Sequence, residues 1–436
     1  CKVVKLEEAW RVTGKAPIST KWVDTDKTHG TGKPMVRSRW VARDFKDPKE
    51  KDREDLFSAT PPLEMIRLMV SRQATVRADG KERKTMYLDI KKAHLAPLCK
   101  TDVYVELPEE ASVQDDECGK LIHWLYGCRP AAQAWEEHYS ALLVDNGFKR
   151  LTTVPVAFTH PVRDLHGVVH GDDFVWEGRE EDLDWILKVL EKEYELKNRG
   201  RLGFGPKDVR KIDILGRVIE LTDQGIKWSG DPRHQQLLEE HFGMKSDTKV
   251  LSKNGYDDEP LQDDDTNDEL DTEEGKVFRG LAARLNYMAQ DNLLLQFPAK
   301  EICKNMSRPR RHDFYKVKRL VRFLKGIGTV SLLYEWQSEE EAMRVTVYVD
   351  SDWAGCRGTR RSTSGGVMTV GKHVLRTWSC TQSTVATSSG EAELISMFEG
   401  ATRGCGMQAI MTEMGLLPVL SVLRVCTDSS VAKSFV

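Results

Sequence analysis

Two hydrophobic periods run along the chain, and together they predict a protein of mixed helices and strands. Alternating apolar positions in residues 18–23 and 35–42 flank a glycine-containing turn and predict a hairpin. Apolar positions spaced by three or four residues predict helices over residues 131–146 and 180–196. Apolar runs on both sides of Asp172 predict a second hairpin with this acid at its turn. This order of elements predicts an α+β sheet whose acidic residues meet at one end.

The second half of the chain continues this mixture. Residues 278–306 and 312–326 have mostly helical patterns. A last α/β unit is predicted to begin with a strand at residues 345–350 and to continue through a glycine-rich hairpin. A helix from about Glu391 and a strand at residues 423–428 complete it.

The length of 436 residues predicts two to four domains. Residues 252–275 hold 11 acidic residues against 1 basic residue, which indicates a solvated linker. We therefore expect a first region at 1–250, an acidic linker at 251–276, a helical region at 277–340 and a final α/β domain at 341–436. Because the sequence starts at a cysteine and stops soon after an acidic motif, we interpret it as part of a longer product.

The composition is that of a globular protein, with 40% apolar and 31% charged residues. There is no run of eighteen apolar residues and no signal-peptide pattern, so no membrane contact is predicted. The nine cysteines are scattered and form no Cys-x-x-Cys pair. A zinc site or disulfide framework is therefore not expected, and a reducing compartment is the default.

The net charge of −3 hides a segregation of charge along the chain. Residues 1–100 carry 23 basic against 14 acidic residues, and residues 300–325 carry 10 against 2. Such stretches can attract phosphates. Each stretch taken alone is better explained as a solvated surface.

Carboxylates at the ends of apolar runs are the most informative chemical feature of the chain. Asp89 ends one such run, and Asp172 and Asp173 interrupt another about eighty residues later. Carboxylates so placed suit a two-metal site for phosphoryl or nucleotidyl transfer, because Mg²⁺ prefers oxygen ligands. Gly-Asp-Asp is also ordinary turn chemistry, so the pair alone is weak evidence.

A second acidic set recurs near the C-terminus. Asp350 and Asp428 are predicted at strand ends and Glu393 on a helix, which together could hold metal ions. Glu391 is an alternative to Glu393, and Asp352 is better explained as a turn acid. Each of these acids could also be an ordinary strand-end or helix residue. Two metal-type sites in one chain indicate a polymerase joined to a nuclease.

Nine segments, in order over nearly the whole chain, resemble the reverse transcriptase and ribonuclease H of copia-type LTR retrotransposons. They are Arg37–Phe45, Asp89–Leu95, Leu125–Gly127 with Ala134 and Trp135, His170–Asp173, Phe278–Leu281, Val321–Gly326, Asp350–Gly355, Arg360–Gly365 and Ser388–Glu393. Any one of them is a weak signal, whereas the ordered set is specific.

The resemblance implies a right-hand polymerase with fingers, palm, thumb and connection, followed by a ribonuclease H-like domain. It implies an RNA-directed DNA polymerase that extends a DNA or tRNA primer on an RNA template with dNTPs. The nuclease would act on the RNA strand of an RNA–DNA hybrid. Two Mg²⁺ ions, or Mn²⁺, would serve each active site. Such a protein works inside the cell, in a cytoplasmic virus-like particle or in the nucleus.

The resemblance also assigns roles to single residues. Asp89 and Asp172 would be the polymerase metal ligands, with Asp173 as a supporting third acid. Arg39 would reach the triphosphate of the incoming nucleotide, since a guanidinium group suits phosphate. His94 stands where the family has an aromatic residue that screens the sugar 2′ position. Asp350, Glu393 and Asp428 would be the nuclease ligands.

Several positions depart from the family pattern. Pro130 stands where a glutamine near the nucleotide is expected, and Gly171 replaces valine, which we expect to loosen the turn. The fourth nuclease acid would lie downstream of Asp428, so we expect a truncated ribonuclease H domain. The alternative to an active polymerase is a decayed or host-adopted relic that binds nucleic acid without turnover.

Overall fold

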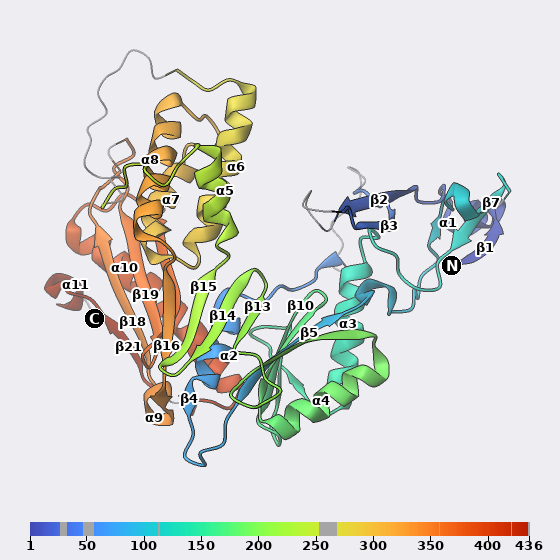
Figure 1. The fold of residues 1–436 in the computed structure, drawn as a ribbon, viewed down its shortest axis with the longest axis horizontal. Coiled ribbons are helices and arrows are strands. Elements are labelled where there is room, and N and C mark those ends of the chain that lie inside the picture. The colour runs from blue at the N-terminus through green and yellow to red at the C-terminus, as the bar shows by residue number, and fades with distance from the viewer. Residues whose placement is uncertain are drawn as a thin grey trace. The chain divides into compact units, whose positions relative to one another are not determined.

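The chain folds into two compact units in the computed structural model (Figure 1). Unit 1 comprises residues 1–62, 88–176 and 181–198, and unit 2 comprises residues 63–87, 177–180 and 199–436. The structure describes residues 1–26, 33–46, 56–111, 114–252, 268–356, 358–419 and 421–434.

Unit 1 contains a three-stranded sheet in the order β1-β7-β6, the hairpin β2-β3 and the helices around them. Its elements are β1 (Lys2–Lys5), α1 (Leu6–Thr13), β2 (Thr20–Asp26), β3 (Val36–Ala42), η2 (Ala93–Leu95), β6 (Tyr104–Val105), η3 (Glu109–Ala111), β7 (Glu117–Lys120), α3 (Ala131–Asp145), β8 (Lys149–Arg150), β9 (Ala157–His160), β10 (Leu165–His170) and most of α4 (Glu180–Glu193). The predicted basic hairpin is confirmed, because β2 and β3 pair antiparallel from Thr20 opposite Ala42 to Asp26 opposite Val36.

A six-stranded sheet in the order β12-β5-β11-β10-β9-β8 carries the first set of acids. Its three remaining strands are β5 (Lys84–Ile90), β11 (Asp173–Gly178) and β12 (Leu196–Leu202). The predicted second hairpin is confirmed: β10 and β11 are neighbours, and Gly171 and Asp172 connect them. The prediction of helices on either side of this hairpin is also confirmed, as α3 and α4.

Unit 2 consists of two further four-stranded sheets and a group of helices. Its elements are α2 (Leu63–Gln73), β4 (Thr75–Val76), β13 (Lys211–Ile214), β14 (Arg217–Thr222), β15 (Gly225–Gly230), α5 (Arg233–His241), α6 (Thr272–Ala289), η4 (Leu293–Leu295), α7 (Gln296–Cys303), α8 (Arg311–Ile327), β16 (Ser331–Glu335), β17 (Gln337–Ser338), α9 (Glu339–Ala342), β18 (Val345–Asp352), β19 (Thr363–Val370), β20 (His373–Thr381), α10 (Ser389–Glu413), β21 (Leu423–Cys426) and α11 (Ser430–Ser434). The sheets have the orders β13-β14-β15-β16 and β20-β19-β18-β21, and β4 pairs with β17. None of the helices in the described ranges is both long enough and apolar enough to cross a membrane.

The region boundaries differ from the sequence prediction in two places. Residues 253–267 of the predicted acidic linker lie outside the described residues, whereas α6 begins inside the linker at Thr272. It begins there because the Asp271 carboxylate accepts the N–H groups of Glu273 and Glu274 at 2.9 Å each. The predicted helical region also contains a strand, β16, which pairs with β15 over five residues. That pairing joins positions about a hundred residues apart, so no local pattern could indicate it.

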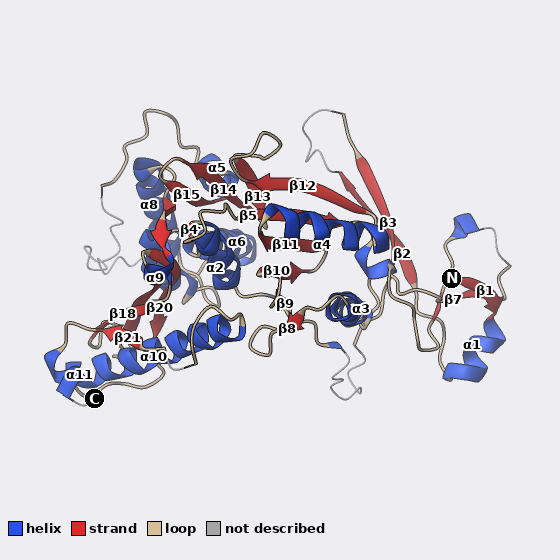
Figure 2. Cartoon of the chain, turned by 90° about the horizontal axis from the view of Figure 1, so that it is seen from below, coloured by secondary structure: helices blue, strands red, loops and turns tan. Residues whose placement is uncertain are grey.

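In the last sheet, α10 lies along strands β18 and β21 (Figure 2). Two glycines one turn apart on α10 allow the close approach. A Cβ atom at Gly400 would lie 2.4 Å from Val349, and one at Gly404 would lie 2.6 Å from Leu423. Larger residues at these positions would push the helix away from the sheet and would displace the side chains at its N-terminal end.

A buried carboxylate ties together several elements of unit 2. Asp291 is 3% exposed and accepts hydrogen bonds from Arg67 at 3.0 Å, Arg217 at 3.1 Å and the indole N–H of Trp228 at 2.8 Å. Arg67 and Arg217 are buried as well, so the one negative charge offsets two buried positive groups. This network fixes Asp291, two residues after the end of α6, against α2, β14 and β15.

We predict that Asp291→Asn lowers the free energy of unfolding by about 3–5 kcal/mol, because it leaves two buried guanidinium groups without a counter-charge. The measurement is urea unfolding followed by circular dichroism. Glu273→Gln is the control: its exposed pair with Lys276 should change the stability by no more than about 1 kcal/mol. Equal unfolding midpoints for Asp291→Asn and the wild type would contradict the importance of this network.

Candidate functional site

The turn between β10 and β11 presents Asp172 to solvent. Gly171 has a φ of +64°, a left-handed conformation that glycine adopts without strain. Asp172 is exposed, and Asp173 is the half-buried first residue of β11. The backbone N–H of Ile90 donates to the Asp172 carbonyl at 2.8 Å, so the end of β5 lies beside this turn. Asp89, the residue before Ile90, is thereby brought next to Asp172 along the backbone.

An aromatic pair lies beside this acidic turn. The ring centroids of His94, on η2, and Tyr126 are 5.2 Å apart. Burial lowers the pKa of the His94 imidazole, and the nearby Asp172 carboxylate opposes this effect. Burial raises the pKa of the Tyr126 hydroxyl, as does Asp172, whereas Arg37 and Arg39 lower it. Tyr126 therefore lies within electrostatic reach of both the acidic turn and the basic hairpin.

The basic hairpin is anchored on the segment that carries Tyr126. The backbone N–H of Ala42, at the end of β3, donates to the Tyr126 carbonyl at 2.7 Å. Gly127 has a φ of +86°, and a Cβ atom there would lie 2.1 Å from the Ala42 carbonyl oxygen. Because side chains alternate along a strand, Arg37 and Arg39 lie on the same face of β3. The anchor thus fixes the base of the strand that carries both arginines.

The three acids predicted from the sequence as the polymerase set lie on β5 (Asp89), in the β10–β11 turn (Asp172) and at the start of β11 (Asp173). In the part of the chain that the structure describes, the carboxylates of Asp89, Asp172 and Asp173 are not all within ligand distance of one another. Asp89 and Asp172 are the two that the neighbouring strands place side by side. Their carboxylate oxygens are of the kind that Mg²⁺ prefers, so the donor set fits such an ion. Their role as ligands stays a prediction.

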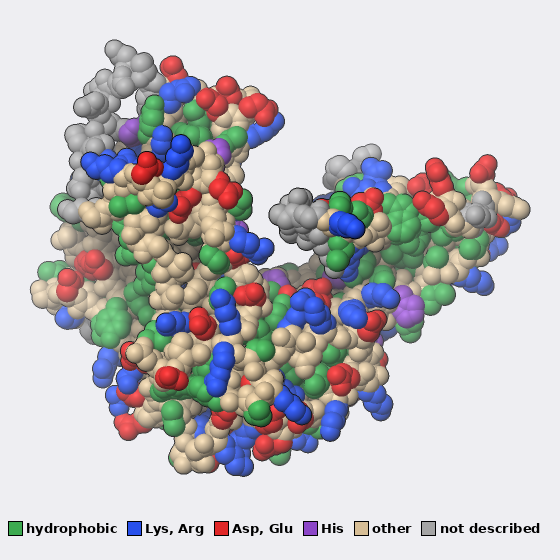
Figure 3. All heavy atoms as spheres, viewed as in Figure 1, with side chains coloured by type: hydrophobic (Ala, Val, Ile, Leu, Met, Phe, Trp, Pro, Cys, Tyr) green, Lys and Arg blue, Asp and Glu red, His purple; other side chains and the backbone are tan. Residues whose placement is uncertain are grey.

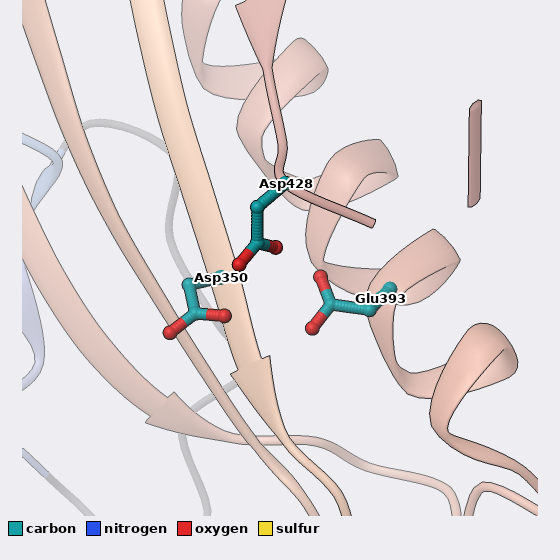
Figure 4. Close-up of side chains that lie close together, drawn as sticks. All are labelled: Asp350, Glu393 and Asp428. Carbon is teal, nitrogen blue, oxygen red and sulfur yellow. The ribbon is translucent and has the colours of Figure 1, made fainter. Parts of the chain in front are cut away.

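The second acidic set does form a cluster. Asp350, Glu393 and Asp428 point toward one another (Figure 4), and one oxygen from each lies within 4.8 Å of the others. Their positions follow from strand register: β18 and β21 pair in parallel with Tyr348 opposite Cys426, so continuing two residues brings Asp350 beside Asp428. Asp350 lies two residues before the end of β18 and Asp428 two residues after β21, whereas the sequence predicted both acids at the strand ends.

Glu393 is the buried member of this cluster. One of its carboxylate oxygens accepts the backbone N–H of Ser351 at 3.2 Å, and the other has no protein partner among the described residues. Burial raises the pKa of the Glu393 carboxyl, and the carboxylates of Asp350 and Asp428 raise it further, while the Ser351 hydrogen bonds oppose this. Three repelling carboxylates with an unsatisfied buried oxygen are suited to binding a divalent cation.

Glu391 and Asp352, which lie near the cluster in sequence, make structural hydrogen bonds instead. Glu391 accepts the backbone N–H of Thr387 at 2.7 Å and its hydroxyl at 2.6 Å, so it closes the start of α10. The Asp352 carboxylate accepts the backbone N–H of Thr363 on the neighbouring strand. The structure therefore brings Glu393, rather than Glu391, to the cluster, and it keeps Asp352 in a structural contact.

The basic stretch at residues 300–325 does not give an uninterrupted positive surface on the face in Figure 3, where acidic and basic side chains alternate over the helices of unit 2. Several of its cations are paired. Lys304 lies 2.5 Å from Glu301, and Lys325 lies 3.1 Å from Glu239. Glu301, on α7, belongs to the stretch itself, whereas Glu239, on α5, lies outside the stretch and offsets one of its excess positive charges.

Comparison with known proteins shows which proteins this chain is similar to. Residues 6–204 match the family described as reverse transcriptase (RNA-dependent DNA polymerase). The chain is 24% identical over 422 residues to the retrovirus-related Pol polyprotein from transposon TNT 1-94 of Nicotiana tabacum, and 22% identical over 419 residues to that from transposon RE1 of Arabidopsis thaliana. Each alignment covers 92% of the chain.

The chain is similar to Pol polyproteins of copia-type retrotransposons, with a reverse transcriptase region at residues 6–204. It spans 30% of the tobacco relative's length and 26% of the Arabidopsis relative's length. Its fold is similar to that of a foamy viral protease-reverse transcriptase solved in complex with double-stranded DNA. The TM-score is 0.51 at 10% sequence identity, and the match covers 100% of this chain and 61% of the viral chain. The expected α+β polymerase fold is confirmed.

Two residues make contacts that the sequence alone did not indicate. Tyr126 belongs to the Leu-Tyr-Gly motif, yet only the structure places its ring beside His94. Trp135 belongs to the Ala-Trp motif, and its indole N–H donates to the Gly171 carbonyl at 2.8 Å. Pro130 caps α3, where its missing N–H costs nothing, so this position provides a helix start and no side-chain donor.

We predict that Glu393→Gln weakens Mn²⁺ binding at the Asp350 cluster at least about tenfold, because a neutral amide is a poorer ligand than a carboxylate. Electron paramagnetic resonance of free Mn²⁺ measures the affinity, in an Asp172→Asn background that removes the predicted polymerase ligand. Glu391→Gln is the matched control and should leave the affinity unchanged. The assignment is wrong if Glu391→Gln weakens binding and Glu393→Gln does not.

Proposed function

We propose that the chain is an RNA-directed DNA polymerase with an associated ribonuclease H-like domain. The observation that carries the polymerase part is the meeting of three features in unit 1. Asp89, on β5, lies beside Asp172, in the β10–β11 turn, and the His94–Tyr126 pair lies beside them. The hairpin bearing Arg39 is anchored on the same Tyr126 segment.

Each residue has a definite task in this proposal. Asp89 and Asp172 would hold two Mg²⁺ ions, which when bound supply charge stabilisation for the attacking and leaving oxygens of nucleotidyl transfer. Arg39 binds the triphosphate of the incoming dNTP through its planar guanidinium group. Arg37, on the same face of β3, adds positive charge toward that group. His94 lies on the sugar side, where its ring limits the space at the 2′ position.

The nuclease part rests on the cluster of Asp350, Glu393 and Asp428. Acids on a strand, on a helix and just after a second strand are suited to holding metal ions at the scissile phosphate of an RNA strand. The Glu393 oxygen without a hydrogen-bond partner would be one ligand of such an ion. The partners we propose are an RNA template, a DNA or tRNA primer and an RNA–DNA hybrid. The proposed location is inside the cell, in a cytoplasmic virus-like particle or in the nucleus.

We predict that Asp172→Asn lowers primer extension on an RNA template by at least about a hundredfold, because several kcal/mol of transition-state stabilisation depend on the bound ions. Primer-template affinity should change little, since basic groups elsewhere supply it. The assay compares single-turnover dNTP incorporation with duplex binding measured by fluorescence anisotropy.

Asp145→Asn, on the exposed end of α3, is the control for a surface acid and should retain full extension. Undiminished extension by Asp172→Asn would refute the metal assignment. Wild-type protein that binds the duplex but extends no primer with Mg²⁺ or Mn²⁺ would instead support the alternative of a relic that binds nucleic acid without turnover.

We also predict that His94→Phe raises the preference for dNTP over rNTP, because phenylalanine is larger and fills more of the space beside the 2′ carbon. The gain should be on the order of tenfold, the discrimination that about 1–2 kcal/mol of steric contact provides. Competitive incorporation of dNTP against rNTP by the same preparation measures the ratio. An unchanged ratio would mean that His94 does not face the sugar.

A further inference from the structure

Trp135 makes a specific polar contact with the turn that carries Asp172. The indole is 2% exposed, and its Nε1–H group donates to the Gly171 carbonyl oxygen at 2.8 Å. The Ile90 N–H group donates to the next carbonyl, that of Asp172, at 2.8 Å. Two consecutive peptide groups of the turn are therefore held from outside, one by α3 and the other by the end of β5.

The indole that makes this contact is itself held in place. Its ring centroid lies 5.3 Å from Tyr139, 6.2 Å from Phe174 and 5.2 Å from Tyr194, with edge-to-face or tilted geometry. Tyr139 and Phe174 are buried, and Phe174 follows directly after Asp173. An aromatic side chain packed on several sides keeps one rotamer, so its N–H group points in a fixed direction.

The hydrogen bond from Trp135 restrains a turn that its own residue 171, a glycine, leaves flexible. Glycine adopts many backbone conformations, and a Cβ atom at Gly171 would meet no atom within 4 Å. Side-chain packing at residue 171 therefore does not restrict the turn. Without the indole N–H, the Gly171 carbonyl would lose its partner, and the peptide could rotate toward water. Rotation of this peptide changes the direction of the Asp172 side chain, which follows it.

We propose that Trp135 is a positioning residue for metal binding: its indole N–H fixes the Gly171–Asp172 peptide and so aims the Asp172 carboxylate. This inference rests on the proposed role of Asp172 as a metal ligand and deepens it. Trp135 would not touch the ion or the substrate. It acts through one hydrogen bond to the backbone, in the way that outer groups orient the ligands of other metal sites.

The test is Mn²⁺ binding by Trp135→Phe, which removes the N–H donor and keeps an aromatic ring in the cluster. Tyr194→Phe is the matched control, because it removes a polar atom from the same aromatic cluster. The Tyr194 hydroxyl has no hydrogen-bond partner among the described residues. Both changes are made in full-length protein carrying Asp350→Asn, so that the second acidic cluster is weakened. Free Mn²⁺ is followed by electron paramagnetic resonance, and thermal unfolding is measured on the same samples.

Trp135→Phe should raise the Mn²⁺ dissociation constant about tenfold, as expected for an outer-group change at a metal site, and Tyr194→Phe should leave it within about twofold. In primer extension, Trp135→Phe should raise the Mg²⁺ concentration for half-maximal rate, and excess Mg²⁺ should restore most of kcat. Equal Mn²⁺ affinity in Trp135→Phe and Tyr194→Phe would overturn the proposal, whatever their melting temperatures.

Two further arms separate this inference from the proposed function. If Asp172→Asn does not weaken Mn²⁺ binding, the metal site itself is wrong and both proposals fail. If Asp172→Asn weakens binding but Trp135→Phe does not, only the positioning role fails. Where Trp135→Phe does not fold, benzothienylalanine at position 135 keeps the shape of indole and lacks the N–H donor, and it should raise the dissociation constant by the same factor.

Discussion

Carboxylates repel one another, and both acidic sites of this chain depend on backbone contacts that hold acids together against this repulsion. In unit 1 the Ile90 N–H bonds the Asp172 carbonyl, which keeps the end of β5 beside the β10–β11 turn. In unit 2 the parallel pairing of β18 with β21 sets Asp350 beside Asp428. A cation bound at either site would relieve this repulsion.

The two sites differ in how closely their carboxylates are grouped. One carboxylate oxygen from each of Asp350, Glu393 and Asp428 lies within 4.8 Å of the others, and burial raises the pKa of Glu393. Asp89 and Asp172 lie side by side along the backbone without a third acid within the same distance among the described residues. The more open arrangement suits Mg²⁺ that binds through one or two carboxylates together with substrate phosphates, as we propose for this site.

The departures from the family pattern at residues 94, 130 and 171 leave the acids in place. Pro130 begins a helix instead of offering a side-chain donor, and His94 packs against Tyr126. Gly171 removes the side chain that would restrict the turn, while Trp135 holds the same peptide by a hydrogen bond. The turn lacks the restraint of a side chain at residue 171 but keeps the hydrogen bond from Trp135. This hydrogen bond explains how the turn keeps its geometry with glycine at position 171.

Local patterns predicted much of this fold, since the paired strands β2 and β3, the helix α3 and the Asp172 turn all follow from hydrophobic period and turn chemistry. The order of the motifs singled out Asp350, Glu393 and Asp428, which the structure brings together. Contacts between distant segments were not predictable in this way. The pairing of β16 with β15, the approach of α10 through Gly400 and Gly404, and the Asp291 network each depend on packing between elements far apart in sequence.

We propose that Asp89 and Asp172 hold catalytic metal ions at one end of the six-stranded sheet that contains β5 and β11. Anomalous diffraction from crystals of the chain with Mn²⁺, an RNA template annealed to a terminated DNA primer, and the matching dNTP tests it directly. We expect anomalous peaks for Mn²⁺ ions that lie between Asp89 and Asp172 and that also contact the triphosphate. A bound nucleotide with its Mn²⁺ held by other residues, and none at Asp89 or Asp172, would contradict it.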